Sequence, residues 1–332
     1  MSAADYAAAK SIPLSAIPVI DVAPLIVGGD AEPVAEALIR AATEVGFFYV
    51  RGHGLPEAVV AGAVAAMEAF FDLPHDAKAT VPVDRTQRGW MASGMATLDE
   101  ARTHDLKEIF FWGPDWAADD LDVLAGVPMM APNKWPDTVM PSLRPAVLAY
   151  HQAVSALGRR LLSAIALGLG LDPGFFASRY TKPLGRGQLV YYPPSEGDDE
   201  AEGRFGAAPH TDFGALTLLL QDMNGGLQVR NRDGEWIAAT PIPDTIVCNI
   251  GDLLQRWSND RLQSTLHRVI NRSGRRRHSI AFFFDPDSRA VIDPRDMAAD
   301  EAPRHAPVTA GEHILGRNAR AFAQYKDEPT KD

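Results

Sequence analysis

The chain has almost no cysteine, since Cys248 is the single one among 332 residues. One cysteine excludes an internal disulfide, and its scarcity fits a reducing compartment, so we expect the protein in the cytoplasm. Residues 1–11 lack the apolar segment of a secretory signal. The longest apolar candidate, residues 161–171, is interrupted by polar residues and glycines and falls short of a membrane-spanning length.

The chain also lacks an excess of positive charge, with 32 Lys and Arg against 43 Asp and Glu, so the formal net charge is −11 at pH 7. Nucleic acids and anionic membranes both demand a basic surface, so neither is expected as the main partner. The share of hydrophobic residues is 46%, which is enough to bury a substantial core and argues against disorder. We expect a small-molecule substrate instead. No signal in the sequence separates a monomer from a homodimer.

The segments predicted for the first half are mostly helical. Helical spacing of apolar residues runs from Asp30, a candidate N-cap, to Gly46, and a β-rich run follows at 47–50. A second helix is expected from Pro56 to Pro74, and a long one over 142–170. Residues 79–133 carry many prolines and tryptophans, and we expect irregular structure there.

From residue 188 onward the pattern changes to short strands separated by Gly and Pro turns. Strands are expected at 188–192, 216–220, 227–229, 236–238, 245–250, 264–270 and 276–284. Many short strands with such turns indicate a sandwich or barrel. Cys248 lies within the apolar run 245–250, where we expect a buried, inert thiol rather than a nucleophile.

The most informative pattern is His210-Thr211-Asp212 followed by His267. Two imidazoles and one carboxylate hold non-haem Fe(II) on one face and leave other positions open. In an extended strand, residues i and i+2 project to the same side, so His210 and Asp212 could bind one ion together. His267, within the strand-like run 264–270, would supply the second imidazole. For a His-x-Asp pair alone, unrelated polar residues or a closed zinc site are the alternatives.

A second pattern follows the Asn271–Gly274 turn signal. Arg277 and Ser279 share one face of the strand predicted there, while His278 points the opposite way. A guanidinium and a hydroxyl two residues apart form a receptor for a carboxylate, because arginine binds such groups in bidentate fashion. We expect a hairpin with His267 on one strand and Arg277 on the other, spanned by one cosubstrate.

These motifs, together with an opening segment, resemble the iron(II)- and 2-oxoglutarate-dependent oxygenase superfamily, in the branch that includes isopenicillin N synthase. The resemblance covers nearly the whole chain, and the pieces that carry it occur in the right order. They are the segments 17–21, 44–50 and 52–54, Tyr191-Tyr192-Pro193-Pro194, His210-Thr211-Asp212, His267 and Arg277-His278-Ser279.

The resemblance implies an α+β, mainly β fold: a double-stranded β-helix (jelly roll) core with flanking helices and an N-terminal α/β extension. The extension would cover 1–140 and the dioxygenase domain 141–332, with the site within about 184–290. The implied cofactors are Fe(II), held by His210, Asp212 and His267, and 2-oxoglutarate and dioxygen as cosubstrates. The reaction implied is hydroxylation of a small organic substrate, with desaturation or ring formation as other outcomes, and release of succinate and carbon dioxide.

The resemblance also assigns roles around the cosubstrate. Arg277 and Ser279 would bind the far carboxylate of 2-oxoglutarate, assisted by the hydroxyl of Tyr192. Val190 is a departure, because a number of relatives carry an asparagine there that also contacts the cosubstrate. The substrate pocket would be built from residues 79–133 and the tail after 292. Phe110, Phe111 and Phe284 are expected in the core rather than in that pocket.

Two alternatives stay open. An oxidase like isopenicillin N synthase keeps the iron pattern but uses arginine and serine to bind other carboxylates, without 2-oxoglutarate. A non-catalytic jelly-roll binding or sensor protein would keep the fold and lose a ligand, whereas all three ligands are present here.

Overall fold

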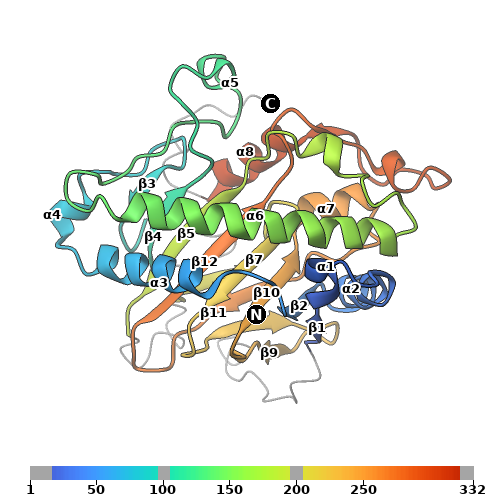
Figure 1. Cartoon of the computed structure of the whole chain (residues 1–332), viewed down its shortest axis with the longest axis horizontal. Helices are drawn as coiled ribbons and strands as arrows, with labels where there is room; N and C mark the ends of the chain where they lie inside the picture. Colours follow the sequence, from blue (N-terminus) through green and yellow to red (C-terminus); the bar gives the residue numbers. More distant parts are fainter. Residues whose placement is uncertain (1–16, 96–104, 195–204, 322–332) are drawn as a thin grey trace.

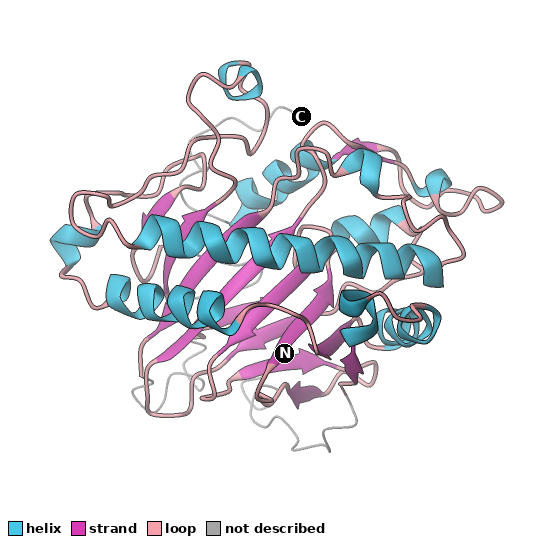
Figure 2. Cartoon of the chain, in the orientation of Figure 1, coloured by secondary structure: helices cyan, strands magenta, loops and turns pink. Residues whose placement is uncertain are grey.

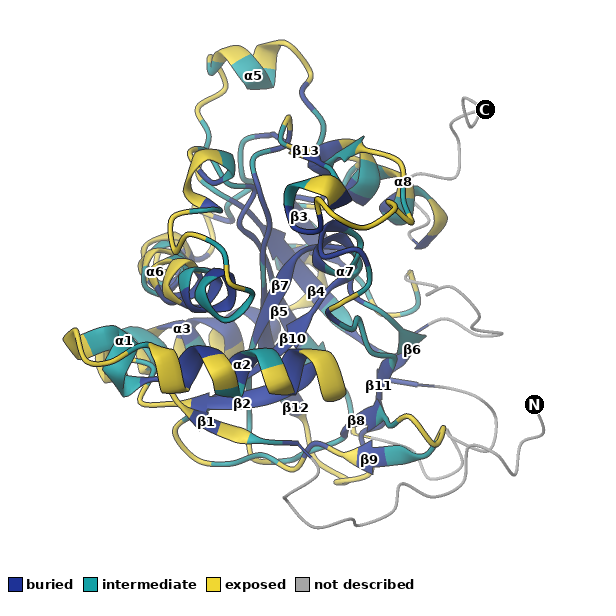
Figure 3. Ribbon diagram, turned by 90° about the vertical axis from the view of Figure 1, so that its right-hand side faces the viewer, coloured by how far each residue is buried: buried dark blue, intermediate teal, exposed yellow. Residues whose placement is uncertain are grey.

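The computed structural model describes residues 17–95, 105–194 and 205–321, so the prediction made for residues 1–11 lies outside the described residues. Two sheets face each other and form the jelly roll expected from the resemblance (Figures 1 and 3). The large sheet has eight strands in the order β1-β2-β10-β7-β12-β5-β4-β3, and the small sheet has four in the order β6-β11-β8-β9. A third, two-stranded sheet pairs β13 with β14.

The strand bounds are as follows. The large sheet contains β1 (Val19–Asp21), β2 (Phe47–Arg51), β3 (Gly89–Met91), β4 (Glu108–Trp112), β5 (Arg186–Tyr192), β7 (Leu216–Gln221), β10 (Thr245–Ile250) and β12 (Arg277–Phe284). The small sheet contains β6 (Ala207–His210), β8 (Leu227–Arg230), β9 (Trp236–Ala238) and β11 (His267–Val269), and the third sheet β13 (Val291–Ile292) and β14 (Val308–Thr309).

Helices cover one face of the large sheet, and the small sheet covers the other (Figures 2 and 3). The long helix α6 crosses the strands with α2 and α3 packed beside it. The α-helices are α1 (Ala23–Val27), α2 (Glu32–Glu44), α3 (Glu57–Phe71), α4 (His75–Lys78), α5 (Leu121–Leu124), α6 (Leu143–Gly168), α7 (Asp252–Trp257) and α8 (Ala310–Ala321). The 3₁₀ helices are η3 (Ala177–Arg179) and η4 (Pro294–Asp296).

Strand alternation gives the large sheet two different faces. On β12, Ile280, Phe282 and Phe284 join the core beneath the helices, whereas Arg277 and Ser279 point into the space between the sheets. Successive side chains of a strand project to opposite sides, so one strand can serve a packed core and a polar cavity at once. The same alternation occurs along β4, β5 and β10.

The helices and strands predicted with clear periodicity are confirmed, with small shifts at their ends. The N-cap position of α2 is occupied by Ala31 rather than Asp30, although the Asp30 carboxylate accepts a hydrogen bond of 3.0 Å from the Glu32 amide. Cys248 is buried on β10, as expected, and burial raises the pKa of its thiol. Its thiol therefore stays protonated and unreactive.

Five strands were missed: β3, β4, β6 and the two short strands β13 and β14. β3 and β4 lie within residues 79–133, for which irregular structure was expected, and part of that range is outside the described residues. β4 reads Glu-Ile-Phe-Phe-Trp and is buried on both faces, so it lacks the alternation that identifies a half-exposed strand. β6 contains Pro209, a residue that argues against a strand in sequence analysis.

The expected hairpin between the strands of His267 and Arg277 was wrong. β11 pairs with β6 and β8 in the small sheet, whereas β12 pairs with β5 and β7 in the large sheet. The connection between them crosses from one sheet to the other, and Asn271 stabilises it by donating to the carbonyls of Pro193 and Arg275. His267 and Arg277 therefore face each other across the sandwich.

Strands from both sides of residue 140 share the large sheet, and the boundary predicted there stays a prediction. Within the three described ranges, no helix combines the length and the apolar character needed to cross a membrane.

Gly46 makes the sharp turn between α2 and β2, with φ +75°. A Cβ at this position would overlap the carbonyl oxygen of Gln263 and the hydroxyl of Thr265. We expect Gly46→Ala to lower the free energy of unfolding by about 2–4 kcal/mol, because overlap adds to left-handed backbone strain. Gly28→Ala is the matched control, since Gly28 has φ +77° with nothing within 4 Å of the added Cβ. Urea unfolding curves give the free energy of unfolding of both variants. An equal decrease in the two would show that the protein relieves the overlap at Gly46 without losing stability.

Candidate active site

The cavity between the two sheets brings together all six residues singled out from the sequence. We call it the clamp cavity, and its volume is about 70 Å³. The six are Tyr192, His210, Asp212, His267, Arg277 and Ser279, and all of them line the cavity. They come from β5, β6, β11, β12 and the turn after β6, so the assembly depends on contacts between distant parts of the chain.

His210 and His267 are direct cross-strand partners in the small sheet, with ring centroids 4.3 Å apart. The Nδ1 atom of His210 lies 2.7 Å from the carbonyl oxygen of Ala208, and that of His267 lies 3.0 Å from the carbonyl oxygen of Thr265. A carbonyl can only accept, so both rings donate from Nδ1 and keep a lone pair on Nε2. Hydrogen bonds of this kind orient metal-binding imidazoles.

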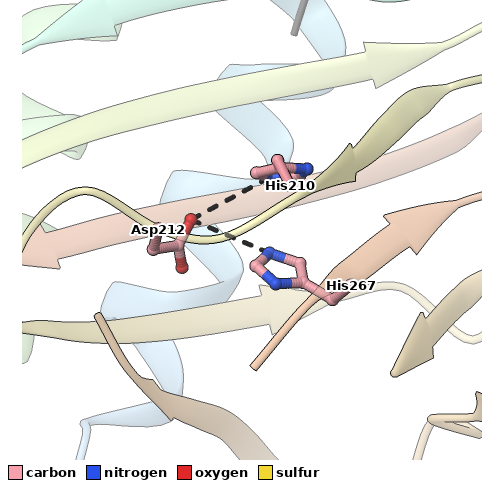
Figure 4. A group of neighbouring side chains, drawn as sticks. All are labelled: His210, Asp212 and His267. Carbon is pink, nitrogen blue, oxygen red and sulfur yellow. Dashed lines mark ion pairs between the residues drawn. The ribbon is translucent and has the colours of Figure 1, made fainter. Parts of the chain in front are cut away.

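Both Nε2 atoms face the Asp212 carboxylate (Figure 4). Its Oδ1 atom lies 3.9 Å from Nε2 of His210 and 3.7 Å from Nε2 of His267. The other oxygen, Oδ2, accepts hydrogen bonds of 2.6 Å from Thr217 and 2.7 Å from Asn249. One oxygen is thus anchored to the large sheet, and the other is directed toward the two imidazoles.

We expected Asp212 to lie on the same strand as His210, but strand β6 ends at His210. The carbonyl of Asp212 accepts instead from the amide of Asp252 at the start of α7. At the next bend, a Cβ on Gly214 would overlap the Asp285 carboxylate, so the chain turns closely against β12. Asp212 still reaches the same point as His210, but from a turn.

The electrostatics of these three residues suit a divalent cation. Burial, together with the neighbouring His267, lowers the pKa of His210 to about 3. Burial alone raises the pKa of Asp212, but the two imidazoles and the hydrogen bonds from Asn249 and Thr217 outweigh it, and the net shift is downward. A neutral imidazole beside a carboxylate anion is the protonation state that metal binding requires. Within the described ranges, these residues form the one cluster of potential metal ligands, with ligand atoms within 4.8 Å of one another.

Arg277 lies on the opposite wall of the clamp cavity and is fully buried. Its Nε donates to the carbonyl oxygen of Gly225 over 2.6 Å, and its guanidinium stacks 4.6 Å from the ring centre of Tyr192. Its Nη1 lies 3.5 Å from the hydroxyl of Ser279. No carboxylate of the described residues forms an ion pair with this guanidinium. A buried cation without a counter-charge favours an anionic ligand.

The neighbours of this clamp agree with the sequence interpretation. Val190 lines the cavity directly across from Ser279, so an apolar side chain occupies the place of the expected amide. His278 points away and packs against Tyr191 and Phe71. The phenylalanines assigned to the core are buried there.

A second cavity adjoins the first on the side away from Arg277. Both cavities contain His210 and Asp212, so the three-residue cluster lies at their junction. The lining of the second cavity comprises Lys107, Ile109, Arg186, Gln188, His210, Thr211, Asp212, Phe213, Phe283 and Asn318. Lys107 and Ile109 come from the range 79–133 and Asn318 from the tail after 292, and the assignment of these segments to a substrate pocket stays a prediction.

Sequence reasoning missed several residues that shape the site. Thr217 and Asn249, the two anchors of Asp212, sit in apolar strands at positions that face the cavity. Their polarity on the inward face was the available signal. Phe283 lines both cavities, although its neighbours Phe282 and Phe284 pack in the core. Lys107 carried no signal in the sequence.

Comparison with known proteins gives two family matches. A sequence profile described as the 2OG-Fe(II) oxygenase superfamily matches residues 183–286. A second profile, described as non-haem dioxygenase in morphine synthesis N-terminal, matches residues 17–138.

Individual proteins match over almost the whole chain. The 2-oxoglutarate-Fe(II) type oxidoreductase hxnY of Emericella nidulans is 32% identical over 95% of this chain and 93% of its own length. Homoarginine-6-hydroxylase 2-ODD-C23 of Glycine max is 34% identical over 91% of this chain and 96% of its own length. The chain belongs to the 2OG-Fe(II) oxygenase superfamily.

The structure of this oxygenase is similar to that of a full-length Neurospora crassa protein solved in complex with alpha-KG (2-oxoglutarate) and thymine. The TM-score is 0.80, with 29% sequence identity and coverage of 91% of this chain and 96% of the Neurospora chain. The protein is thus a non-haem Fe(II)/2-oxoglutarate-dependent dioxygenase of the isopenicillin N synthase-like branch. It oxidises a small organic substrate with release of succinate and carbon dioxide. The relatives support this function over an oxidase that does not use 2-oxoglutarate and over a non-catalytic binding protein.

Proposed function

We propose that His210, Asp212 and His267 are the Fe(II) ligands of this oxygenase. The convergence of two Nε2 atoms and one carboxylate oxygen supports this assignment. Each of the three side chains is oriented by a hydrogen bond at its other polar atom, Nδ1 of the imidazoles or Oδ2 of the carboxylate. Two neutral imidazoles and one carboxylate leave a net positive charge at a bound Fe(II), which attracts an anionic chelating cosubstrate.

We further propose that Arg277, Ser279 and Tyr192 bind the far carboxylate of 2-oxoglutarate. Arg277 lies on the wall facing the metal ligands, so a dicarboxylate could contact both ends of the clamp cavity. Tyr192 is paired directly with Arg277 across β5 and β12, which places its side chain on the same face. The guanidinium would neutralise the carboxylate in a site closed to water.

The primary substrate would bind in the second cavity, next to the metal ligands and away from Arg277. Bound Fe(II) supplies the open coordination positions at which 2-oxoglutarate and dioxygen react, and we propose hydroxylation of a substrate C–H bond as the outcome. Phe213, Phe283 and Ile109 would shield that bond from water. The names of relatives point to different substrates, since one is a homoarginine hydroxylase and another was solved with thymine.

We also propose a cytoplasmic monomer or homodimer without nucleic-acid or membrane partners. The acidic net charge of −11 and the single cysteine support this proposal. Light scattering on the purified chain would distinguish the two oligomeric states.

Anaerobic titration with Fe(II) and then 2-oxoglutarate tests the metal and cosubstrate assignment together. We expect a weak visible charge-transfer band that saturates at one equivalent of each, because 2-oxoglutarate would chelate the bound iron. Asp212→Asn is expected to abolish it. A folded wild-type protein that gives no band would contradict the proposed ligands.

Arg277→Ala should weaken 2-oxoglutarate binding by about 30-fold or more, because it removes one partner of a buried charged pair. The affinity for Fe(II), measured in the same anaerobic titration, should stay unchanged and serves as the internal control. Arg277→Lys keeps the charge but loses the bidentate hydrogen-bonding geometry of the guanidinium, so we expect an intermediate loss of 2-oxoglutarate affinity. Unchanged 2-oxoglutarate affinity in the alanine variant would refute the clamp.

Thr217→Val should weaken Fe(II) binding by about 10-fold, because outer hydrogen bonds to a ligating carboxylate typically contribute that much. The change is nearly isosteric and removes only the 2.6 Å hydrogen bond to Asp212. Thr245→Val, on β10, is the matched control, since its hydroxyl donates to the carbonyl of Ile242 away from the site. Equal Fe(II) affinities in the two variants would show that Asn249 alone positions the carboxylate.

A further inference from the structure

Lys107 occupies an unusual place in this protein, because it lines both the clamp cavity and the second cavity. It lies one residue before β4, directly beside the metal ligands, and is only 7% exposed. Lysine is almost never this buried unless its charge is paired. Its position therefore calls for an explanation that core packing does not give.

The charge of Lys107 is only partly satisfied within the protein. Its ammonium lies 2.9 Å from Oδ2 of Asp105, the one carboxylate of the described residues that pairs with it. The other oxygen of Asp105 accepts from the amide of Ala208, two residues before His210. An ammonium has three donors, and Asp105 lines neither cavity. Asp105 thus pairs with the ammonium from outside the cavities, and Lys107, which lines both of them, keeps donors for a ligand there.

Arg186, the other basic residue that lines the second cavity, already forms a buried ion pair. Its Nε and Nη2 both donate to Oδ2 of Asp285, over 3.1 Å and 2.9 Å. Asp285 is fully buried and also accepts from the amide of Ala215. Arg186 is therefore part of the wall, whereas Lys107 keeps free hydrogen-bonding capacity.

The rest of the second cavity is suited to a compact molecule with one polar end. Ile109, Phe213 and Phe283 provide apolar surface, and the side-chain amides of Gln188 and Asn318 are neutral. A cationic group would meet Lys107 and Arg186 at short range, and such like-charge contact is unfavourable. An anionic oxygen would complete the hydrogen bonding of Lys107 in a buried setting, where charge-assisted bonds are strong.

We propose that the primary substrate of this oxygenase is a small monocarboxylate whose carboxylate is bound by Lys107. This inference rests on the proposed function, because it places the substrate in the cavity next to the metal ligands. Binding of the carboxylate at Lys107 would lay the hydrocarbon part of the substrate against Phe213 and Phe283. Lys107 is then the residue that selects for substrate charge.

The test uses wild-type protein loaded anaerobically with Fe(II) and 2-oxoglutarate. Monocarboxylates from acetate to phenylacetate, each paired with its uncharged amide, are titrated while the charge-transfer band and the melting temperature are followed. We expect at least one acid to bind about 10-fold or more tightly than its amide, the amount that one charged hydrogen bond contributes. If no acid binds, or if acids and amides bind equally, the proposal is overturned.

Variants assign the preference to Lys107. Lys107→Met should abolish the preference for acids and Lys107→Arg should retain it, while both variants still give the charge-transfer band with Fe(II) and 2-oxoglutarate. Because Lys107→Met leaves Asp105 buried without its partner, the double variant Asp105→Asn plus Lys107→Met removes the pair together, with Asp105→Asn as its control. Lys182→Met is a control for a lysine outside both cavities, since Lys182 pairs with Asp120 and Asp122.

The outcomes separate this inference from the proposed function. If wild-type protein gives no charge-transfer band, the metal and cosubstrate assignment fails before any acid is added. If Lys107→Met weakens 2-oxoglutarate binding instead, Lys107 serves the cosubstrate, and the substrate proposal is overturned while the metal site stands. A preference for acids that survives in Lys107→Met also overturns the proposal.

Discussion

The active site depends on the hydrogen bonds that orient its two imidazoles and one carboxylate. Backbone carbonyls of Ala208 and Thr265 fix the Nδ1 side of each ring, and Thr217 and Asn249 fix one oxygen of Asp212. The ligand atoms that these hydrogen bonds leave free therefore point to the same place. Rigid outer hydrogen bonds of this kind are what allow a three-ligand site to keep other positions open. The pairing of β6 with β11 makes this arrangement possible.

Strand alternation explains how one sheet can support both stability and chemistry. The helix-facing side chains of β5, β10 and β12 are apolar and buried against α6, while their other faces carry the anchors and the carboxylate clamp. Residues that bind ligands are thus fixed by the same backbone that holds the core. A rigid scaffold limits the misplacement of reacting groups, to which catalysis is sensitive. Most residues of the site lie on strands, and Asp212 reaches it from the turn after β6.

The active site contains buried cations although the whole chain is acidic, with a net charge of −11. Arg277 lies on one side, and Lys107 and Arg186, which pair with Asp105 and Asp285, lie on the other. Buried charges act at short range in a medium of low dielectric, so they dominate ligand choice inside the cavity. The proposed ligands of the site, 2-oxoglutarate and a monocarboxylate, are both small anions, in keeping with Arg277 and Lys107 at its two sides.

Sequence patterns were enough to predict the fold class and the family, and they singled out six residues that meet in the clamp cavity. Period and turn signals predicted most strands, and the order of His210, Asp212, His267 and Arg277 predicted the chemistry. How these residues meet depends on strand pairing, which such patterns do not report. The expected hairpin was wrong because the chain changes sheets at Asn271, and the contribution of Lys107 could not be foreseen because a lone lysine before a non-alternating strand gives no pattern. Local periodicity reports which face a residue occupies, but pairing between distant strands decides which faces lie opposite each other.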